Sequence, residues 1–206
     1  QLIPERIACV LIAGNHDSPR KLAALERLLD RLRIFVRAEP APPDAGGVVV
    51  VPSRDGRETA RIAVLPFVAE RRVVDACALM SSEYTWYELY SDRIAQMLAV
   101  LTRGFGGDTI NLALAHVLID GALVGSGVRS LHLGEIYAAK AERLPDNLHY
   151  IGLGHLHRPQ MIDAPSRAAY AGSILELDFG EVEQQKSVVL VEASPGRPAE
   201  IRTVPL

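Results

Sequence analysis

Two short histidine motifs, far apart in the chain, are the strongest chemical signal in the sequence. They are Gly14-Asn15-His16-Asp17 and Gly154-His155-Leu156-His157. Each follows an apolar run, residues 7–13 and residues 150–153, and His116 closes a third such run. We therefore expect three buried strands to end at these residues. Open α/β sheets bind ligands at the carboxyl edge of their strands, so imidazole and amide groups gathered there predict a metal site.

The donor types favour a divalent ion such as Mn²⁺ over a structural zinc. His155 and His157 stand two residues apart, and on extended chain both rings would project to the same side. Neutral imidazole is a good ligand for Mn, Fe or Zn, and Asn15 offers a carbonyl oxygen suited to a hard ion. Structural zinc sites usually recruit thiolates. An isolated His-x-His is most often only a polar strand end, but its combination with the other motifs favours a site.

The composition is that of one large globular domain. A chain of 206 residues, 49% hydrophobic and 23% charged, can bury a sizeable core. We find no apolar run near the roughly 20 residues of a membrane span and no signal peptide. Cys9 and Cys77 cannot form a disulfide framework, and Cys9 among aliphatic residues suggests a small buried hydrophobe. We therefore expect a cytoplasmic protein. Its net charge of −3 confines any DNA contact to local cationic patches.

Strand-like and helix-like segments alternate along the chain. Residues 20–33 carry leucines at helical spacing, and residues 84–103 predict a second helix. Two β-branched runs, 48–51 and 62–65, flank Asp55-Gly56 and predict a hairpin. Further short strands are expected at 34–36, 161–162, 169–171, 187–191 and 201–204. The natural architecture is a mixed sheet sandwich with helices outside.

Longer strings around the motifs resemble the calcineurin-like metallophosphoesterases and, within them, the SbcD nuclease subfamily. The strings are residues 11–20, 152–160, 170–173, 177–181 and 186–192. The resemblance implies an α/β fold, a four-layer α/β/β/α sandwich lacking its first strands and its capping domain, with residues 1–206 as a single partial nuclease domain. It implies a DNA exonuclease and endonuclease with two Mn²⁺ ions, or Mg²⁺, that works with an SbcC-type ATPase in DNA repair.

The resemblance also assigns roles to the motif residues. It implies one ion with three ligands and a second ion with one, namely Asn15, His116 and His155 for the first and His157 for the second. These groups should converge within a few ångströms, the span of a two-metal centre. His16 would contact the phosphate and protonate the leaving 3′-oxygen, with Asp17 orienting its ring. The alternatives are that His16 is a turn residue and that Asp17 caps the helix following Ser18-Pro19.

Other polar residues near and outside the motifs carry weaker signals. Arg20, Lys21 and Arg158 flank the expected centre and are predicted to contact DNA phosphates, unless they are only solvated surface charges. His132 and His149 are expected to be ordinary surface or capping groups. Asp120-Gly121 is typical of a turn.

The helix at residues 20–33 is the expected site of self-association. In the family this helix contributes to a dimer interface. Its spacing turns four leucines toward the core, namely Leu22, Leu25, Leu29 and Leu32. Leu28 falls on another face, where it is either a homodimer contact or a singly exposed leucine.

The departures from the family pattern concern the two ends of the chain. The family's first two motifs, an Asp-x-His and a Gly-Asp, would precede Gln1, and its capping domain would follow Leu206. They supply the carboxylate that bridges the metals. We therefore expect a trimmed nuclease domain with an exposed sheet edge and little activity alone. Two rival functions remain, a phosphoesterase of small molecules and a non-catalytic interaction domain with an incomplete site.

Overall fold

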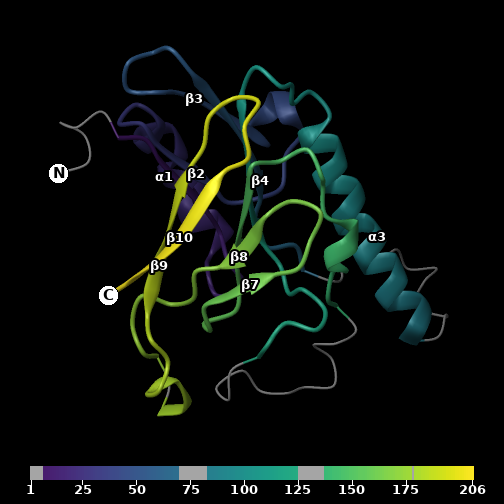
Figure 1. Ribbon diagram of the computed structural model, residues 1–206. Helices are drawn as coiled ribbons and strands as arrows, with labels where there is room; N and C mark the ends of the chain where they lie inside the picture. The colour runs from purple at the N-terminus through teal and green to yellow at the C-terminus, as the bar shows by residue number, and fades with distance from the viewer. Residues whose placement is uncertain (1–6, 70–82, 125–136, 178) are drawn as a thin grey trace.

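The computed structural model describes residues 7–69, 83–124, 137–177 and 179–206 (Figure 1). The predictions for Cys77 and His132 lie outside these residues, as do residues 1–6 and Asp178. The helices are α1 (Pro19–Asp30) and α3 (Glu83–Thr102), with short 3-10 helices η1 (Pro43–Ala45), η3 (Ala141–Arg143) and η4 (Phe179–Glu181). The strands are β1 (Cys9–Ile12), β2 (Ile34–Arg37), β3 (Val48–Pro52), β4 (Thr59–Leu65), β5 (Ile110–His116), β6 (Tyr150–Gly154), β7 (Gln160–Ile162), β8 (Ala168–Tyr170), β9 (Ser187–Glu192) and β10 (Glu200–Pro205).

A six-stranded mixed sheet forms the centre of the molecule, in the order β3-β4-β5-β6-β8-β7. β4, β5, β6 and β8 run parallel, while β3 and β7 are antiparallel edge strands. The antiparallel pairing of β3 with β4 confirms the predicted hairpin. His116 pairs in register with Gly154, so β5 and β6 end at the same level. This register brings two of the three histidine motifs to one edge of the sheet.

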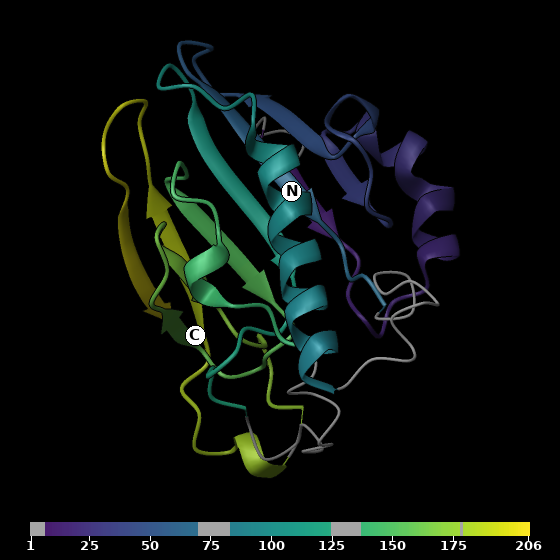
Figure 2. The ribbon, with the colours of Figure 1, turned by 90° about the vertical axis from the view of Figure 1, so that its right-hand side faces the viewer.

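The main core lies between α3 and one face of this sheet. Figures 1 and 2 show α3 crossing that face, with β9, β10 and α1 on the opposite side. The core joins one stripe of α3 to small and branched residues of the strands, namely Tyr90, Ile94, Leu98, Leu101, Ala63, Ala113, Ala115, Ile151 and Leu153. Side chains alternate along a strand, so His116 faces away from α3 because Ala115 faces toward it.

The side of the sheet opposite α3 carries two separate strand pairs. β1 and β2 are parallel partners, and β9 and β10 are antiparallel partners. Among the described residues these pairs do not join into one sheet. The mixed α/β class is therefore confirmed, whereas a four-layer sandwich stays a prediction. No helix in the described part of the chain is both long and apolar enough to cross a membrane.

Helix α1 departs from its prediction in length and in burial. It ends at Asp30, and Arg33 adopts a φ of 61° that turns the chain into β2. Leu25 and Leu32 are 46% and 40% exposed, so their predicted core positions are wrong. The reason is that α1 rests on β1 and β2 alone, which are too narrow a support for a full leucine stripe. Leu28 is 63% exposed. Cys9 is only half-buried, which corrects the expectation of a core residue.

The contrast between two residues of α3 tests this account of the core. Leu98 is fully buried, whereas Val100, half a turn away, is 47% exposed. Leu98→Ala should lower the free energy of unfolding by about 2–5 kcal/mol because it leaves a cavity under the helix. Val100→Ala should change it by about 0.5 kcal/mol or less. Urea unfolding of both variants followed by circular dichroism measures the difference, and equal effects would contradict the packing of α3.

Candidate metal centre

The imidazole of His116 is packed between the backbones of two glycines. A Cβ atom placed on Gly14 would lie 2.6 Å from Cε1 of His116, and one placed on Gly154 would lie 2.8 Å from its Nδ1. Both distances are shorter than any real van der Waals contact, so neither position tolerates a side chain without moving the ring. The expectation was that these glycines serve tight turns. The structure instead shows that they make room for His116.

Asn15 and His155 complete a cluster around His116. Nε2 of His116 lies 2.9 Å from Oδ1 of Asn15, and the Asn15 amide N–H also points at Nε2 from 3.4 Å. The rings of His116 and His155 lie edge to face, with centroids 5.4 Å apart. Phe67 packs against the other side of His116 at 6.0 Å. Residues from the ends of β1, β5 and β6 therefore meet at one edge of the molecule.

His155 sits in a turn rather than on extended chain. β6 ends at Gly154, and His155 has a φ of 111°, in a region that residues with a Cβ rarely occupy. This corrects the expectation that the rings of His155 and His157 follow strand alternation. Leu156 between them is buried in the core. Nδ1 of His155 is buried and has no hydrogen-bond partner. A strained backbone and an unpartnered buried nitrogen are typical of functional sites.

His157 faces a buried carboxylate. Its Nδ1 lies 2.7 Å from Oε1 of Glu181, which itself is held by Lys186. The sequence predicted no role for these two charged residues, although both lie within the strings that resemble SbcD. The signal was weak because Glu and Lys are normally surface residues, and nothing local shows that they are buried as a pair.

His16 is exposed beside this cluster, and Asp17 is engaged with the backbone. Oδ2 of Asp17 accepts a hydrogen bond of 2.7 Å from the Gly14 N–H. Asp17 therefore closes the turn after β1 and does not cap α1, whose N-cap residue is Ser18. Orientation of the His16 ring by Asp17 stays a prediction.

Burial and mutual repulsion keep the central rings neutral. Burial, followed by the neighbouring His155 ring, lowers the pKa of His116 to about 4, although Asp17 opposes the shift. Burial also lowers the pKa of His155, with smaller contributions from His157 and His16. His16 and His157 therefore lie close enough to act on the central pair. Neutral imidazole is the form that binds metal ions.

The cluster offers a mixed set of donors. In the described part of the chain, no three His, Cys, Asp or Glu side chains are arranged to hold a metal ion. The third donor beside His116 and His155 is the amide of Asn15. Arg20, Lys21 and Arg158 are exposed, as a role at the surface requires.

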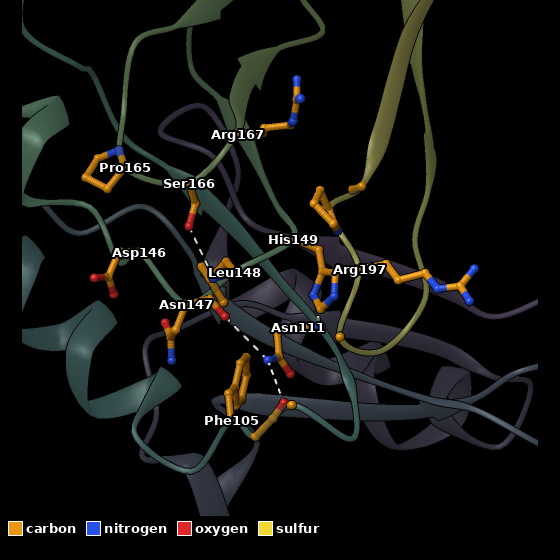
Figure 3. Close-up of a pocket in the computed structure, with 15 residues that line it drawn as sticks. Phe105, Asn111, Asp146, Asn147, Leu148, His149, Pro165, Ser166, Arg167 and Arg197 are labelled. Atoms are coloured by element: carbon orange, nitrogen blue, oxygen red, sulfur yellow. Dashed lines mark hydrogen bonds between the residues drawn. The ribbon is translucent and has the colours of Figure 1, made fainter.

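The largest pocket lies at the opposite edge of the sheet, where β5, β6 and β8 begin (Figure 3). It measures about 580 Å³. His149 lines it and has a structural role, because Nδ1 receives the Asn111 N–H at 2.9 Å and Nε2 lies 3.1 Å from the Ser194 carbonyl. Arg167 and Arg197 point away from these polar groups in Figure 3. The predicted turn at Asp120-Gly121 is confirmed, with Gly121 at a φ of 73°.

Curated proteins similar to this chain share one name, that of the SbcD component of the SbcCD nuclease. The chain is 33% identical over 191 residues to SbcD of Bacillus subtilis, across 92% of the chain and 48% of the relative. SbcD of Escherichia coli is 29% identical across 91% of the chain and 47% of the relative. That of Rhodobacter capsulatus is 29% identical across 98% and 51%. No model of a known protein family matches.

These similarities confirm the resemblance to SbcD that the motifs predict. The alignments cover about nine tenths of the chain or more, so they include both histidine motifs and the strings between them. The chain spans about half the length of the curated relatives it matches.

Substitution of Gly154 tests the packing around His116. Gly154→Ala should lower the free energy of unfolding by about 1–3 kcal/mol, because the new methyl group meets a ring that Gly14 blocks from behind. It should also shift the NMR signals of His116. Gly107→Ala is the matched control, since a Cβ there meets nothing within 4 Å. A Gly154→Ala protein as stable as the control, with unchanged His116 signals, would contradict this packing.

Proposed function

We propose that this chain is the nuclease domain, in part, of an SbcD-type protein that hydrolyses DNA phosphodiester bonds with divalent metal ions. The observation that carries the proposal is the meeting of Asn15, His116 and His155 at one edge of the molecule, in a chain similar to the SbcD components of SbcCD nucleases. The protein would work as an exonuclease and endonuclease with an SbcC-type ATPase in DNA end processing and repair.

The donors around His116 fit one divalent ion. The buried Nδ1 of His155 lacks a partner, and a bound cation would satisfy it. The rings of His116 and His155 are held neutral, and Asn15 adds an amide oxygen. Nitrogen and oxygen donors of this kind suit Mn²⁺, with Mg²⁺ as a harder alternative. A second ion would draw on His157, and among the described residues no carboxylate cluster accompanies it.

The chain's own residues would bind and protonate the substrate. Divalent ions bound there would polarise the phosphate and activate a water molecule for attack. His16 is exposed next to the cluster, where it can donate a proton to the leaving 3′-oxygen. Asp17 keeps the turn that carries His16 in place through the Gly14 amide. Arg20, Lys21 and Arg158 would contact phosphates of the DNA backbone.

A nuclease assay with Mn²⁺ on linear duplex DNA tests this function. The full-length protein should cleave the DNA, and His16→Ala should reduce the rate by about 10²- to 10⁴-fold, the usual contribution of a general acid. Residues 1–206 alone should have little activity, because one amide and three imidazoles cannot offset the charge of two ions.

Three outcomes of this assay would contradict the proposal. Hydrolysis of p-nitrophenyl phosphates without cleavage of DNA would indicate a small-molecule phosphoesterase. Absence of both activities in the full-length protein would indicate an interaction domain. Unchanged DNA cleavage by His16→Ala would show that another group protonates the leaving oxygen.

The exposed face of α1 is the proposed homodimer contact. Leu28 is 63% exposed and Leu25, almost one turn earlier, is 46% exposed. Leu28→Asp should shift the full-length protein from dimer toward monomer in sedimentation velocity, because it places a charge within an apolar contact. Ala23→Asp adds the same charge at an exposed position of another face and should not. Equal behaviour of the two variants would identify Leu28 as a singly exposed leucine.

A further inference from the structure

A buried polar cluster lies directly behind His157. It consists of Glu181, Lys186 and Ser173, which we call the Glu181 cluster. Glu181 is 2% exposed and Lys186 is 7% exposed, although charged residues are almost never this buried without a partner. Glu181 belongs to η4, Lys186 immediately precedes β9, and Ser173 follows β8. Three separate segments therefore meet behind one histidine.

The hydrogen bonds of this cluster are complete. Nζ of Lys186 has three N–H donors and meets three acceptors, Oε2 of Glu181 at 2.7 Å, Oγ of Ser173 at 2.8 Å and Oε1 of Gln184 at 3.2 Å. Oε2 of Glu181 also accepts bonds of 3.2 Å from the Ser173 hydroxyl and from the Leu177 N–H. Burial alone would raise the pKa of Glu181, but these bonds, with that from Lys186 foremost, lower it to about 2. Glu181 is therefore an ionised carboxylate.

The remaining oxygen of Glu181 determines the tautomer of His157. An ionised carboxylate can only accept hydrogen bonds, so the 2.7 Å contact requires His157 to donate from Nδ1. A neutral ring that carries its proton on Nδ1 keeps a lone pair on Nε2. The imidazole is thus held in one tautomer and one rotation by a carboxylate that Lys186 fixes in turn.

The same segment also holds the backbone of His157. The Ser173 N–H donates a bond of 3.1 Å to the His157 carbonyl. Gly172 passes so close that a Cβ there would lie 2.5 Å from this carbonyl oxygen, and its φ is +82°. The ring and the backbone of His157 therefore depend on residues 172–186.

Stability alone does not account for this arrangement. A buried ion pair costs much of its attraction in lost hydration, and well-packed apolar residues in its place are often equally stable or more so. A carboxylate that receives the second ring N–H of a histidine is, by contrast, a recurrent feature of metal-binding histidines, where it sets the tautomer and the orientation of the ring.

We propose that Glu181, held by Lys186 and Ser173, is a positioning residue that fixes His157 with its proton on Nδ1 and leaves Nε2 free to bind a divalent ion. This inference rests on the proposed function, because it gives His157 its purpose as a ligand. Glu181 acts through His157 and does not itself bind the ion.

The test compares the tautomer of His157 with the affinity for Mn²⁺ in the full-length protein. Nitrogen-15 NMR of labelled histidine in metal-free protein should show His157 protonated on Nδ1. Glu181→Gln should lose this fixed tautomer and bind Mn²⁺ roughly 10- to 100-fold more weakly, as measured by electron paramagnetic resonance of the free ion. Glu183→Gln removes an exposed carboxylate two residues away and should change neither quantity.

A second variant covers the case in which an unpaired Lys186 prevents folding of Glu181→Gln. Glu181→Leu combined with Lys186→Met removes both charges and should fold, but it should also lose the tautomer and the affinity. A merely structural role would leave both unchanged in any variant with normal thermal stability.

The outcomes separate this inference from the proposed function. His157 protonated on Nε2 in the wild type, or unchanged Mn²⁺ affinity in folded variants, would overturn the role of Glu181. A wild type that shows the expected tautomer but does not bind Mn²⁺ would overturn the proposed function, and it would still support the hold of Glu181 on His157.

Discussion

The close packing of one imidazole against two glycine backbones is the constraint on which the rest of the site depends. His116 is the last residue of β5, and its ring occupies the space where Gly14 and Gly154 lack a side chain. This contact fixes the distance between the turn after β1 and the end of β6. Asn15 and His155 are the next residues in those two segments, so they are brought to His116 by the same packing. The motif glycines are thus required by a contact with a side chain from a third segment.

A second set of contacts holds the segments that leave this edge of the sheet. The Tyr170 hydroxyl donates to the Val117 carbonyl at 2.7 Å and accepts the Ile119 N–H at 3.0 Å, which ties the end of β8 to the chain just beyond His116. Ser173 binds the backbone of His157, and Glu181 binds its ring. The strings that resemble SbcD outside the histidine motifs therefore have a physical explanation, because they hold the loops that carry the histidines.

The sequence predicted the elements well and the reasons for their arrangement less well. The described strands and both helices lie where periodicity placed them, since alternation and helical spacing are local properties. Leu25 and Leu32 were misplaced because burial of a helix face depends on how many strands support it, which spacing does not show. The turn at His155 was missed because a left-handed φ at a histidine has no local signal. Glu181 and Lys186 were missed because their pairing is a tertiary contact between two residues that look like surface charges.

The distribution of charge explains why the chain gathers neutral donors at this edge. Asp17 and Glu181, the acidic residues nearest the histidines in these contacts, are used to hold a backbone amide and an imidazole ring. The charge of Glu181 is already balanced by Lys186 at 2.7 Å. A divalent ion beside His116 would therefore meet amide and imidazole groups, which supply lone pairs but no negative charge. Two ions a few ångströms apart repel strongly unless anions lie between them. The described residues thus suit the first ion better than the pair, and the anionic ligands that a pair requires must come from elsewhere in the assembled site.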